Sequence, residues 1–105
     1  MTIEQFQRTI EETYGERDAA RGLERTFIWF VEEVGELARA LRSESHERKV
    51  EEFSDVLAWL TTTASLAGVE MSEAAERFAR GCPKCDRSPC ECRREGREKD
   101  SSPRR

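Results

Sequence analysis

Hydrophobic positions recur at helical spacing along the first two thirds of the chain. The first such pattern predicts a helix over about 3–14 and beyond, and Thr2 and Gln5 form a plausible capping box at its start. Gly15 and Gly22 bracket the expected loose end of this helix. The chain therefore opens with an amphipathic helix followed by a break.

Two further amphipathic helices are predicted over about 23–41 and from about Val50 to near Gly68, with the polar residues 43–47 as a short connection. The short connection makes the two helices antiparallel neighbours. We expect the apolar stripe of each helix to face the core. On the first of them the stripe consists of Phe27, Phe30, Val31, Val34, Leu37, Ala38 and Leu41. On the second it consists of Val50, Phe53, Leu57, Leu60, Thr61 and Ala64.

The C-terminal third predicts a different organisation. Ser72 is placed to cap a short fourth helix that ends before Gly81. Residues 93–105 contain no apolar side chain to bury, so we expect them to be disordered. The predicted organisation is a helical domain over 1–81, a cysteine segment over 82–92 and a charged tail.

Composition supports an all-α fold. Charged residues make up 38% and hydrophobic residues 36% of 105 residues, as is usual for amphipathic helices packed in a bundle. We expect an antiparallel bundle of about four helices. Because a chain of this size buries a modest fraction of its surface, we expect oligomerisation to complete the bundle. No apolar stretch is long enough to span a membrane and no leader pattern is visible, which predicts a cytoplasmic protein without membrane partners.

Charge is distributed unevenly between the two predicted parts. Residues 1–81 carry 10 basic and 17 acidic side chains, whereas residues 82–105 carry 8 basic and 5 acidic ones. The acidic body does not fit a general nucleic-acid binder, and we expect no nucleic-acid partner. An acidic domain that handles phosphates needs divalent cations, because carboxylates repel phosphate.

Four acidic residues recur as two matched pairs on the second and third helices. Glu33 and Glu36 lie three residues apart, so their side chains face the same way, and Glu52 and Asp55 repeat this spacing. Mg²⁺ prefers oxygen ligands in octahedral geometry and rarely finds them all on one element. Two carboxylate pairs on facing helices therefore predict a Mg²⁺ site, with room for two ions.

A tryptophan accompanies each acidic pair. Helical geometry places Trp29 and Trp59 on the acidic face of their helices, away from the apolar stripe. A solvated face seldom carries tryptophan, and the acids of the second helix lack a basic residue four positions further on, so we expect a site lined by acids and aromatics. The alternative is an ordinary exposed surface, because glutamate is common there.

The phrases FVEEVGELARAL and EEFSDVLAWL carry the signature E-E-x-x-E followed, after a spacer, by E-x-x-D. In these phrases and over about 3–80 the chain resembles the MazG-like all-α nucleoside triphosphate pyrophosphohydrolases. The resemblance implies Mg²⁺, with Mn²⁺ as an alternative, bound by the acids that match Glu33, Glu36, Glu52 and Asp55. It also implies hydrolysis of (d)NTPs between the α and β phosphates, which clears surplus or non-standard nucleotides, and assembly as a homo-dimer or homo-tetramer.

Other residues receive roles from the same resemblance. Glu32 is placed to act as general base or to orient the attacking water, unless it is simply solvated. Trp29 and Trp59 are candidates for stacking the base, with burial at a subunit interface as the competing reading. Many relatives contact the phosphates through a lysine and an asparagine of the last helix. This chain has no asparagine, so its phosphate contacts are assigned to three cations that could equally be surface charges: Lys49, Arg77 and Arg80.

Four cysteines form the pattern C-x2-C-x4-C-x-C: Cys82, Cys85, Cys90 and Cys92. Four soft ligands at this spacing suit tetrahedral Zn²⁺. With all four positions filled by protein, the zinc should be structural. The alternative is a reactive or disordered thiol cluster. Some relatives are similar in ending with such a CPxC…CxC tail.

Two other functions compete with hydrolysis. In the first, the helical body is a non-catalytic interaction module whose zinc-bound basic tail recruits a protein or nucleic-acid partner. In the second, the bundle holds two iron ions, which normally requires Glu-x-x-His on two helices. The only histidine, His46, lies in a predicted loop, which argues against the iron site.

Overall fold

The computed structural model describes residues 1–43 and 45–92, which form an all-helical structure without strands. The helices are α1 Ile3–Arg21, α2 Leu23–Ala40, α3 His46–Leu66 and α4 Met71–Glu76. The chain divides into two compact units, Met1–Ser72 and the part from Glu73 onward. The predicted all-α fold with four helices is confirmed, while the prediction for 93–105 lies outside the described residues.

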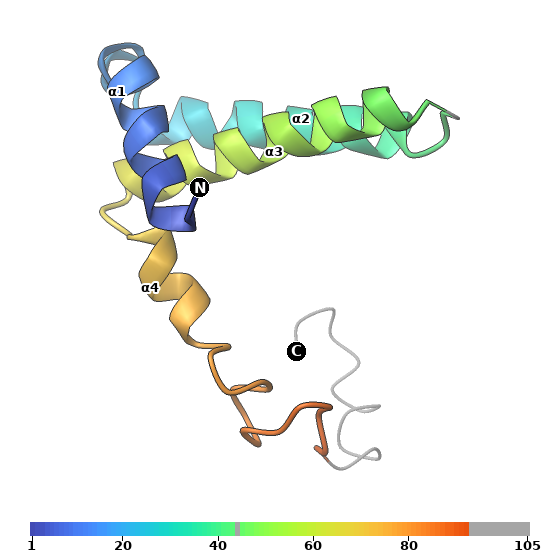
Figure 1. Cartoon of the computed structure of the whole chain (residues 1–105). Coiled ribbons are helices and arrows are strands. Elements are labelled where there is room, and N and C mark those ends of the chain that lie inside the picture. Colours follow the sequence, from blue (N-terminus) through green and yellow to red (C-terminus); the bar gives the residue numbers. More distant parts are fainter. Residues whose placement is uncertain (44, 93–105) are drawn as a thin grey trace. The chain divides into compact units, whose positions relative to one another are not determined.

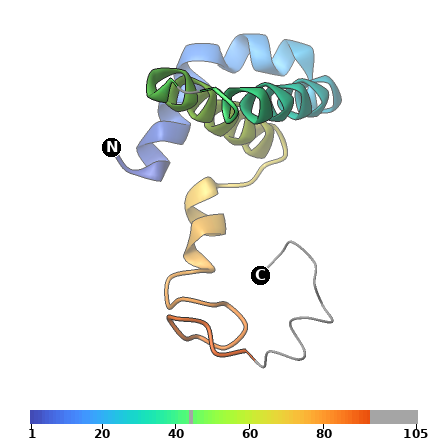
Figure 2. The same cartoon turned by 90° about the vertical axis from the view of Figure 1, so that its right-hand side faces the viewer.

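The helices of the first unit are arranged around an antiparallel pair. Figure 1 shows α2 and α3 side by side, and α1 lies against the end of the pair where α2 begins and α3 ends. Figure 2 gives a second view of the same arrangement, with α1 running across α2 and α3. The opposite end of the pair, near the α2–α3 connection, is therefore not covered by α1.

Helix α1 is longer than the sequence indicates. Its predicted capping box is present, because Thr2 Oγ1 accepts from the Gln5 amide and Gln5 Oε1 accepts from the Thr2 amide. Gly15 lies inside the helix, and the loose end expected between Gly15 and Gly22 is helical, since one helical glycine costs only about 1 kcal/mol relative to alanine. The break comes at Gly22, whose φ of 90° is accessible to glycine at little cost.

The starts of α3 and α4 also differ from the prediction. Ser45 caps α3 by accepting from the Arg48 amide, so His46 begins this helix and is not in a loop. Ser72 lies inside α4 and does not cap it, because the helix already begins at Met71. The Met71 amide instead donates to the side chain of Gln7, a partner from α1 that the local sequence does not show.

A polar contact joins α1 to the end of α3. The side chain of Gln7 is completely buried, and its Nε2 donates to Ser65 Oγ at 2.8 Å and to the Val69 carbonyl at 3.1 Å. Ser65 Oγ in turn donates to Glu11 at 2.7 Å. Buried polar groups are costly unless they are hydrogen-bonded, so this network favours one position of α1 on α3.

Most residues of the apolar stripes of α2 and α3 are exposed, although Thr61 is fully buried. Val31 is 51% exposed and Phe53 is 54% exposed, and among the described hydrophobic residues only Ile10 and Ala40 are buried. The expectation that the stripes form the core of the chain is therefore wrong. The physical reason is coverage, because two helices with α1 at one end can bury only one face of each. Acids and tryptophans of α2 and α3 meet each other instead, as the contact between Trp29 and Trp59 and the proximity of Glu33, Glu52 and Asp55 show.

None of the described helices is long and apolar enough to cross a membrane.

Candidate active site

Three carboxylates from α2 and α3 converge between the two helices. Oxygens of Glu33, Glu52 and Asp55 all lie within 4.8 Å of one another. Glu33 comes from the middle of α2, and the other two lie three residues apart on α3, so antiparallel packing brings the matched acids together. Glu33 and Glu52 are partly buried and Asp55 is exposed, which leaves the cluster open on one side.

The electrostatics of this acid cluster favour a cation. Burial, and after it the charges of Asp55 and Glu52, raise the pKa of Glu33 above its usual value. Glu52 Oε1 is buried and has no hydrogen-bond partner among the described residues. A buried carboxylate oxygen without a donor is rare, and a divalent cation would satisfy it while removing the repulsion. The donor set, three oxygen ligands with an open side, fits Mg²⁺ or Mn²⁺.

Glu36 does not join the acid cluster. Its carboxylate accepts from Arg39 Nη2 at 2.7 Å, a surface ion pair with the residue three positions further along α2. This partner lies at i+3, whereas the expectation that Glu36 lacks a basic partner rested on position i+4. Exposed ion pairs of this kind contribute little free energy, so Glu36 is readily available for another rotamer.

A cavity of about 280 Å³ adjoins the acid cluster, because Asp55 belongs to both. Its walls come from α1, α2 and α3. The lining residues are Tyr14, Arg17, Asp18, Arg21, Trp29, Asp55, Ala58, Trp59 and Thr62. Trp29 and Trp59 meet edge to face with centroids 5.6 Å apart. The cavity is therefore lined by both aromatic and charged side chains, as in many sites for small molecules.

Arg21 occupies a central place in this cavity. Its guanidinium carbon lies 5.0 Å from the ring centroid of Trp29 and 4.8 Å from that of Trp59, so both rings attract its charge. Its Nε donates to Thr26 Oγ1, and its Nη2 donates to Asp18. The second oxygen of Asp18 accepts from Thr62 at 3.2 Å. This network fixes the end of α1 against α2 and α3.

The second unit holds a cluster of four thiols. The sulfur atoms of Cys82, Cys85, Cys90 and Cys92 all lie within 4.8 Å of one another, and none is in a disulfide. The loop is tight, because a Cβ at Gly81 would lie 2.5 Å from the Arg87 carbonyl oxygen. Amides of Cys85 and Lys84 lower the pKa of Cys82 to about 6. The cluster is compatible with tetrahedral zinc.

A model of the MazG nucleotide pyrophosphohydrolase domain matches residues 21–87, more than half of the chain. The chain belongs to the MazG nucleotide pyrophosphohydrolase family. No curated protein matches it. The matched span includes α2, α3, α4 and the first two cysteines, whereas α1 before Arg21 lies outside it.

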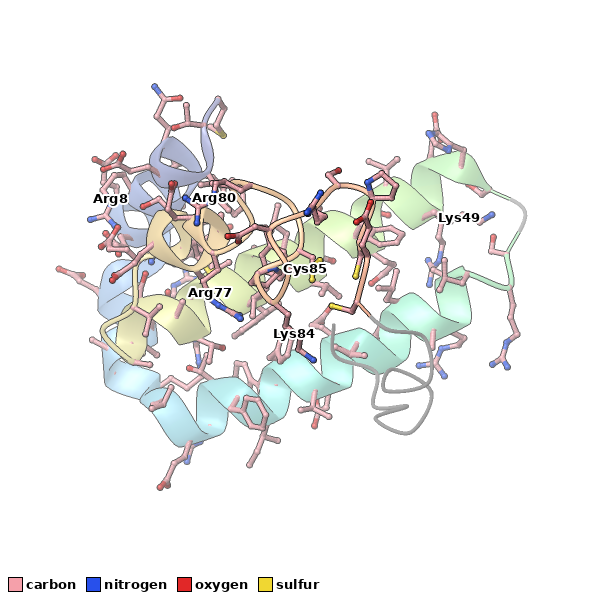
Figure 3. All side chains as sticks on the ribbon, turned by 90° about the horizontal axis from the view of Figure 1, so that it is seen from below. Arg8, Lys49, Arg77, Arg80, Lys84 and Cys85 are labelled. Atoms are coloured by element: carbon pink, nitrogen blue, oxygen red, sulfur yellow. The ribbon has the colours of Figure 1, made fainter. Side chains whose placement is uncertain are left out.

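Two further residues predicted for the site, Glu32 and Lys49, do not belong to the acid cluster. Glu32 is exposed on α2 beside Glu33. In Figure 3, Lys49 lies near the α2–α3 connection, at the far end of the first unit from Arg8 on α1. The Lys49 ammonium makes no ion pair with a described residue.

Arg77 and Arg80 belong to the second unit, where Figure 3 shows them after α4. The fourth helix ends at Glu76, so neither arginine lies on it, contrary to the sequence prediction. Arg77 lies over the ring of Phe78, with 5.5 Å to its centroid, and Arg80 pairs with Asp86 at 3.2 Å. Both cations thus have local partners.

Sequence reasoning missed the residues that α1 brings to the MazG cavity. Asp18 and Arg21 form an i, i+3 acid–base pair near the end of α1, which is a detectable signal. The prediction left both residues in the loose end of the first helix, between Gly15 and Gly22. Their role became visible only when α1 was seen to continue to Gly22 and contact α3.

Proposed function

We propose that this protein hydrolyses nucleoside triphosphates to nucleoside monophosphate and pyrophosphate in the presence of Mg²⁺. One observation carries the proposal: three carboxylates of the family signature lie within 4.8 Å of one another, and Glu52 Oε1 among them is buried without a donor. Such an arrangement is costly unless a cation balances it. A body with net acidic charge also needs cations to bind a polyphosphate.

The acid cluster supplies the groups that the reaction needs. Glu33, Glu52 and Asp55 would hold the divalent cation, and Glu36 would join them by leaving Arg39. When bound, a divalent cation neutralises charge on phosphate oxygens and makes a coordinated water more acidic. Glu32, one residue from Glu33 and exposed, is the candidate group to accept a proton from the attacking water.

The adjoining cavity is the proposed site of the nucleoside. Asp55 lines both the cavity and the acid cluster, so a base in the cavity would leave its phosphates at the cation. Trp29 and Trp59 provide aromatic surface that suits any base. Arg21 already covers a face of each ring, so the base would lie beside Arg21 and contact the surfaces that remain.

Zinc in the thiol cluster is proposed as a structural element. Three backbone amides donate to sulfur: Lys84 to Cys82 at 3.4 Å, Glu91 to Cys85 at 3.3 Å, and Cys92 to Cys90 at 3.4 Å. Such donors favour thiolates, the form that binds metal. With four protein ligands the ion would have no position for substrate.

A second copy of this chain is the proposed partner for the exposed apolar stripes. Large apolar side chains recur on the outer faces of α2 and α3, at i, i+3 and i+4 spacings, and so continuous a pattern is unusual on a monomer. Because so few hydrophobic residues are buried in one chain, association supplies the missing core. A homo-dimer or homo-tetramer in the cytoplasm is the assembly we propose.

A panel of (d)NTPs with Mg²⁺ tests the proposal, with monophosphate and pyrophosphate measured for the protein and for Glu52→Gln. Product release that depends on Glu52 supports it. No release above that of the variant refutes it. If the protein does not hydrolyse nucleotides but binds another protein or a nucleic acid, and loses this binding when residues 82–105 are deleted, the non-catalytic interaction module is the better account.

A further inference from the structure

Arg21 uses part of its guanidinium group in hydrogen bonds within the protein and keeps other N–H groups available for a ligand. An arginine side chain has five N–H donors in a fixed fork. Only two of them meet acceptors among the described residues, Nε at Thr26 and Nη2 at Asp18, which leaves three. The Arg21 and Asp18 side chains are only 12% and 11% exposed, so the guanidinium lies within the cavity walls and not in bulk solvent.

The same contacts hold the guanidinium in one orientation. The rings of Trp29 and Trp59 approach its carbon at 5.0 and 4.8 Å, and Asp18 is itself held by Thr62. A side chain fixed by packing and by hydrogen bonds can discriminate between ligands, because it does not rotate to suit each of them. Arg21 is therefore a prepared donor and not a mobile surface charge.

The cavity offers donors more readily than acceptors. Arg17, the second cation of the wall, is exposed, makes no ion pair with a described residue and can only donate. Both oxygens of Asp18 already accept a hydrogen bond, and Asp55 belongs to the acid cluster. A ligand edge that presents oxygen or ring-nitrogen acceptors would satisfy these donors. An amino group in place of the oxygen would leave the donor that faces it unpaired.

We propose that Arg21 determines base specificity, by favouring nucleotides whose base carries a carbonyl oxygen where adenine or cytosine carries an amino group. The substrate class is then that of 6-oxopurine and 4-oxopyrimidine nucleoside triphosphates. Arginine recognises such an edge through a carbonyl oxygen and, in purines, the adjacent ring nitrogen. Sites built to donate a hydrogen bond reject analogues that cannot accept it. This inference rests on the proposed hydrolysis, whose substrate it narrows.

Two substrate pairs differ in the exocyclic group in question, together with the proton on the adjacent ring nitrogen, and test the inference on the unaltered protein. ITP and ATP differ in the 6-oxo and 6-amino group, and UTP and CTP differ in the 4-oxo and 4-amino group. We expect kcat/KM to favour ITP over ATP and UTP over CTP by about tenfold or more. Ratios near one in both pairs, or ratios that favour the amino bases, overturn the inference while hydrolysis itself stands.

Variants assign the preference to Arg21. In Arg21→Gln, whose amide both donates and accepts, both ratios should fall toward one through a higher KM for the oxo bases. The matched control is Arg25→Gln, an exposed arginine on α2 outside the cavity, which should keep both ratios. Ratios that persist in a folded Arg21→Gln protein contradict the assignment.

Binding without catalysis separates this inference from the proposed function. The chain has two tryptophans, and both line the cavity, so their fluorescence reports its occupancy. Inosine should bind to the metal-free protein more tightly than adenosine, by a similar factor. If inosine is preferred but no triphosphate is hydrolysed, the inference stands and the proposed function fails. If neither nucleoside changes the fluorescence, or adenosine binds as tightly, the inference is wrong.

Discussion

The two candidate metal centres are built in opposite ways. The acid cluster takes its ligands from two helices of 18 and 21 residues, and packing of those helices alone brings three carboxylates within 4.8 Å. The thiol cluster takes its ligands from a loop of eleven residues, 82–92. None of its four cysteines is buried: Cys90 is exposed and the other three are half-buried. The first centre is positioned without a bound cation, whereas we expect the second to depend on a bound metal for its order.

Removal of zinc should therefore have the largest effect, and only on the second unit. Structural zinc contributes on the order of 10–16 kcal/mol in small zinc peptides. A zinc-selective chelator, or the substitution Cys82→Ser, should lower zinc from about one per chain to none and abolish protection of the loop amides in hydrogen exchange. Hydrolysis with Mg²⁺ should remain. A parallel loss of hydrolysis would show that the two centres depend on each other.

Loss of one acid should come next and should act on the first unit alone. Glu52→Gln removes a charge from the cluster while keeping the shape of the side chain, and we expect kcat to fall by about 100-fold or more. The matched control is Glu51→Gln, an exposed neighbour on α3 outside the cluster. The zinc content of both variants should equal that of the unaltered protein. Equal rates for the two variants would remove Glu52 from the site.

A smaller effect is expected at the outer face of α2 and α3. Phe53 is 54% exposed and lies one residue beyond Glu52, so Phe53→Asp changes the apolar stripe without changing the cluster. Burying a charge at an apolar interface is unfavourable, and we expect the dissociation constant of the oligomer to rise by about tenfold or more. Sedimentation measures this constant. An unaltered oligomer, or a monomeric protein before substitution, would contradict the proposed role of the stripe.

The smallest effect concerns the charge of the acid cluster in metal-free protein. Because burial and neighbouring carboxylates raise the pKa of Glu33, the folded state binds this proton more tightly than the unfolded state. The stability that protonated Glu33 contributes to the folded state is fully present below the ordinary glutamate pKa, about 4.3. It is lost as the pH rises through the raised pKa of Glu33 in the folded protein. Without metal, Glu33→Gln should therefore melt above the unaltered protein at pH 7.

That difference in melting temperature should shrink as the pH falls toward the ordinary glutamate pKa, and Mg²⁺ should stabilise the unaltered protein more than the variant. Glu51→Gln again serves as the control and should follow the unaltered protein at each pH. A variant that melts lower than the unaltered protein at pH 7 without metal would show that Glu33 is not under electrostatic strain.

The contrast between the centres also explains what could be predicted from the sequence. Periodicity and caps are local properties, so α2 was placed within one residue of its observed end and the capping box of Thr2 was confirmed. The cysteine spacing is equally local, and the four sulfurs do lie together. Where all the residues that determine a feature lie close together in the sequence, the pattern is sufficient to predict that feature.

The errors came from contacts between distant segments. The side chain of Gln7 from α1 binds the amide that begins α4, which displaced the expected cap at Ser72. Asp18 and Arg21 acquired their place only through Thr62 on α3 and the two tryptophans. The apolar stripes were expected to form the core of the chain, but most of their residues are exposed in the single chain. Periodicity identifies a face, and the partner of that face depends on tertiary or quaternary packing.

The central claim is that Glu33, Glu52 and Asp55 bind one divalent cation together. Anomalous diffraction from crystals soaked in Mn²⁺ tests it most directly, because manganese replaces Mg²⁺ at oxygen sites and scatters anomalously. The claim predicts a manganese peak bonded to carboxylate oxygens of all three residues, at about 2.2 Å, slightly longer than magnesium distances. No peak between α2 and α3, or a peak held by one of these residues alone, would contradict it.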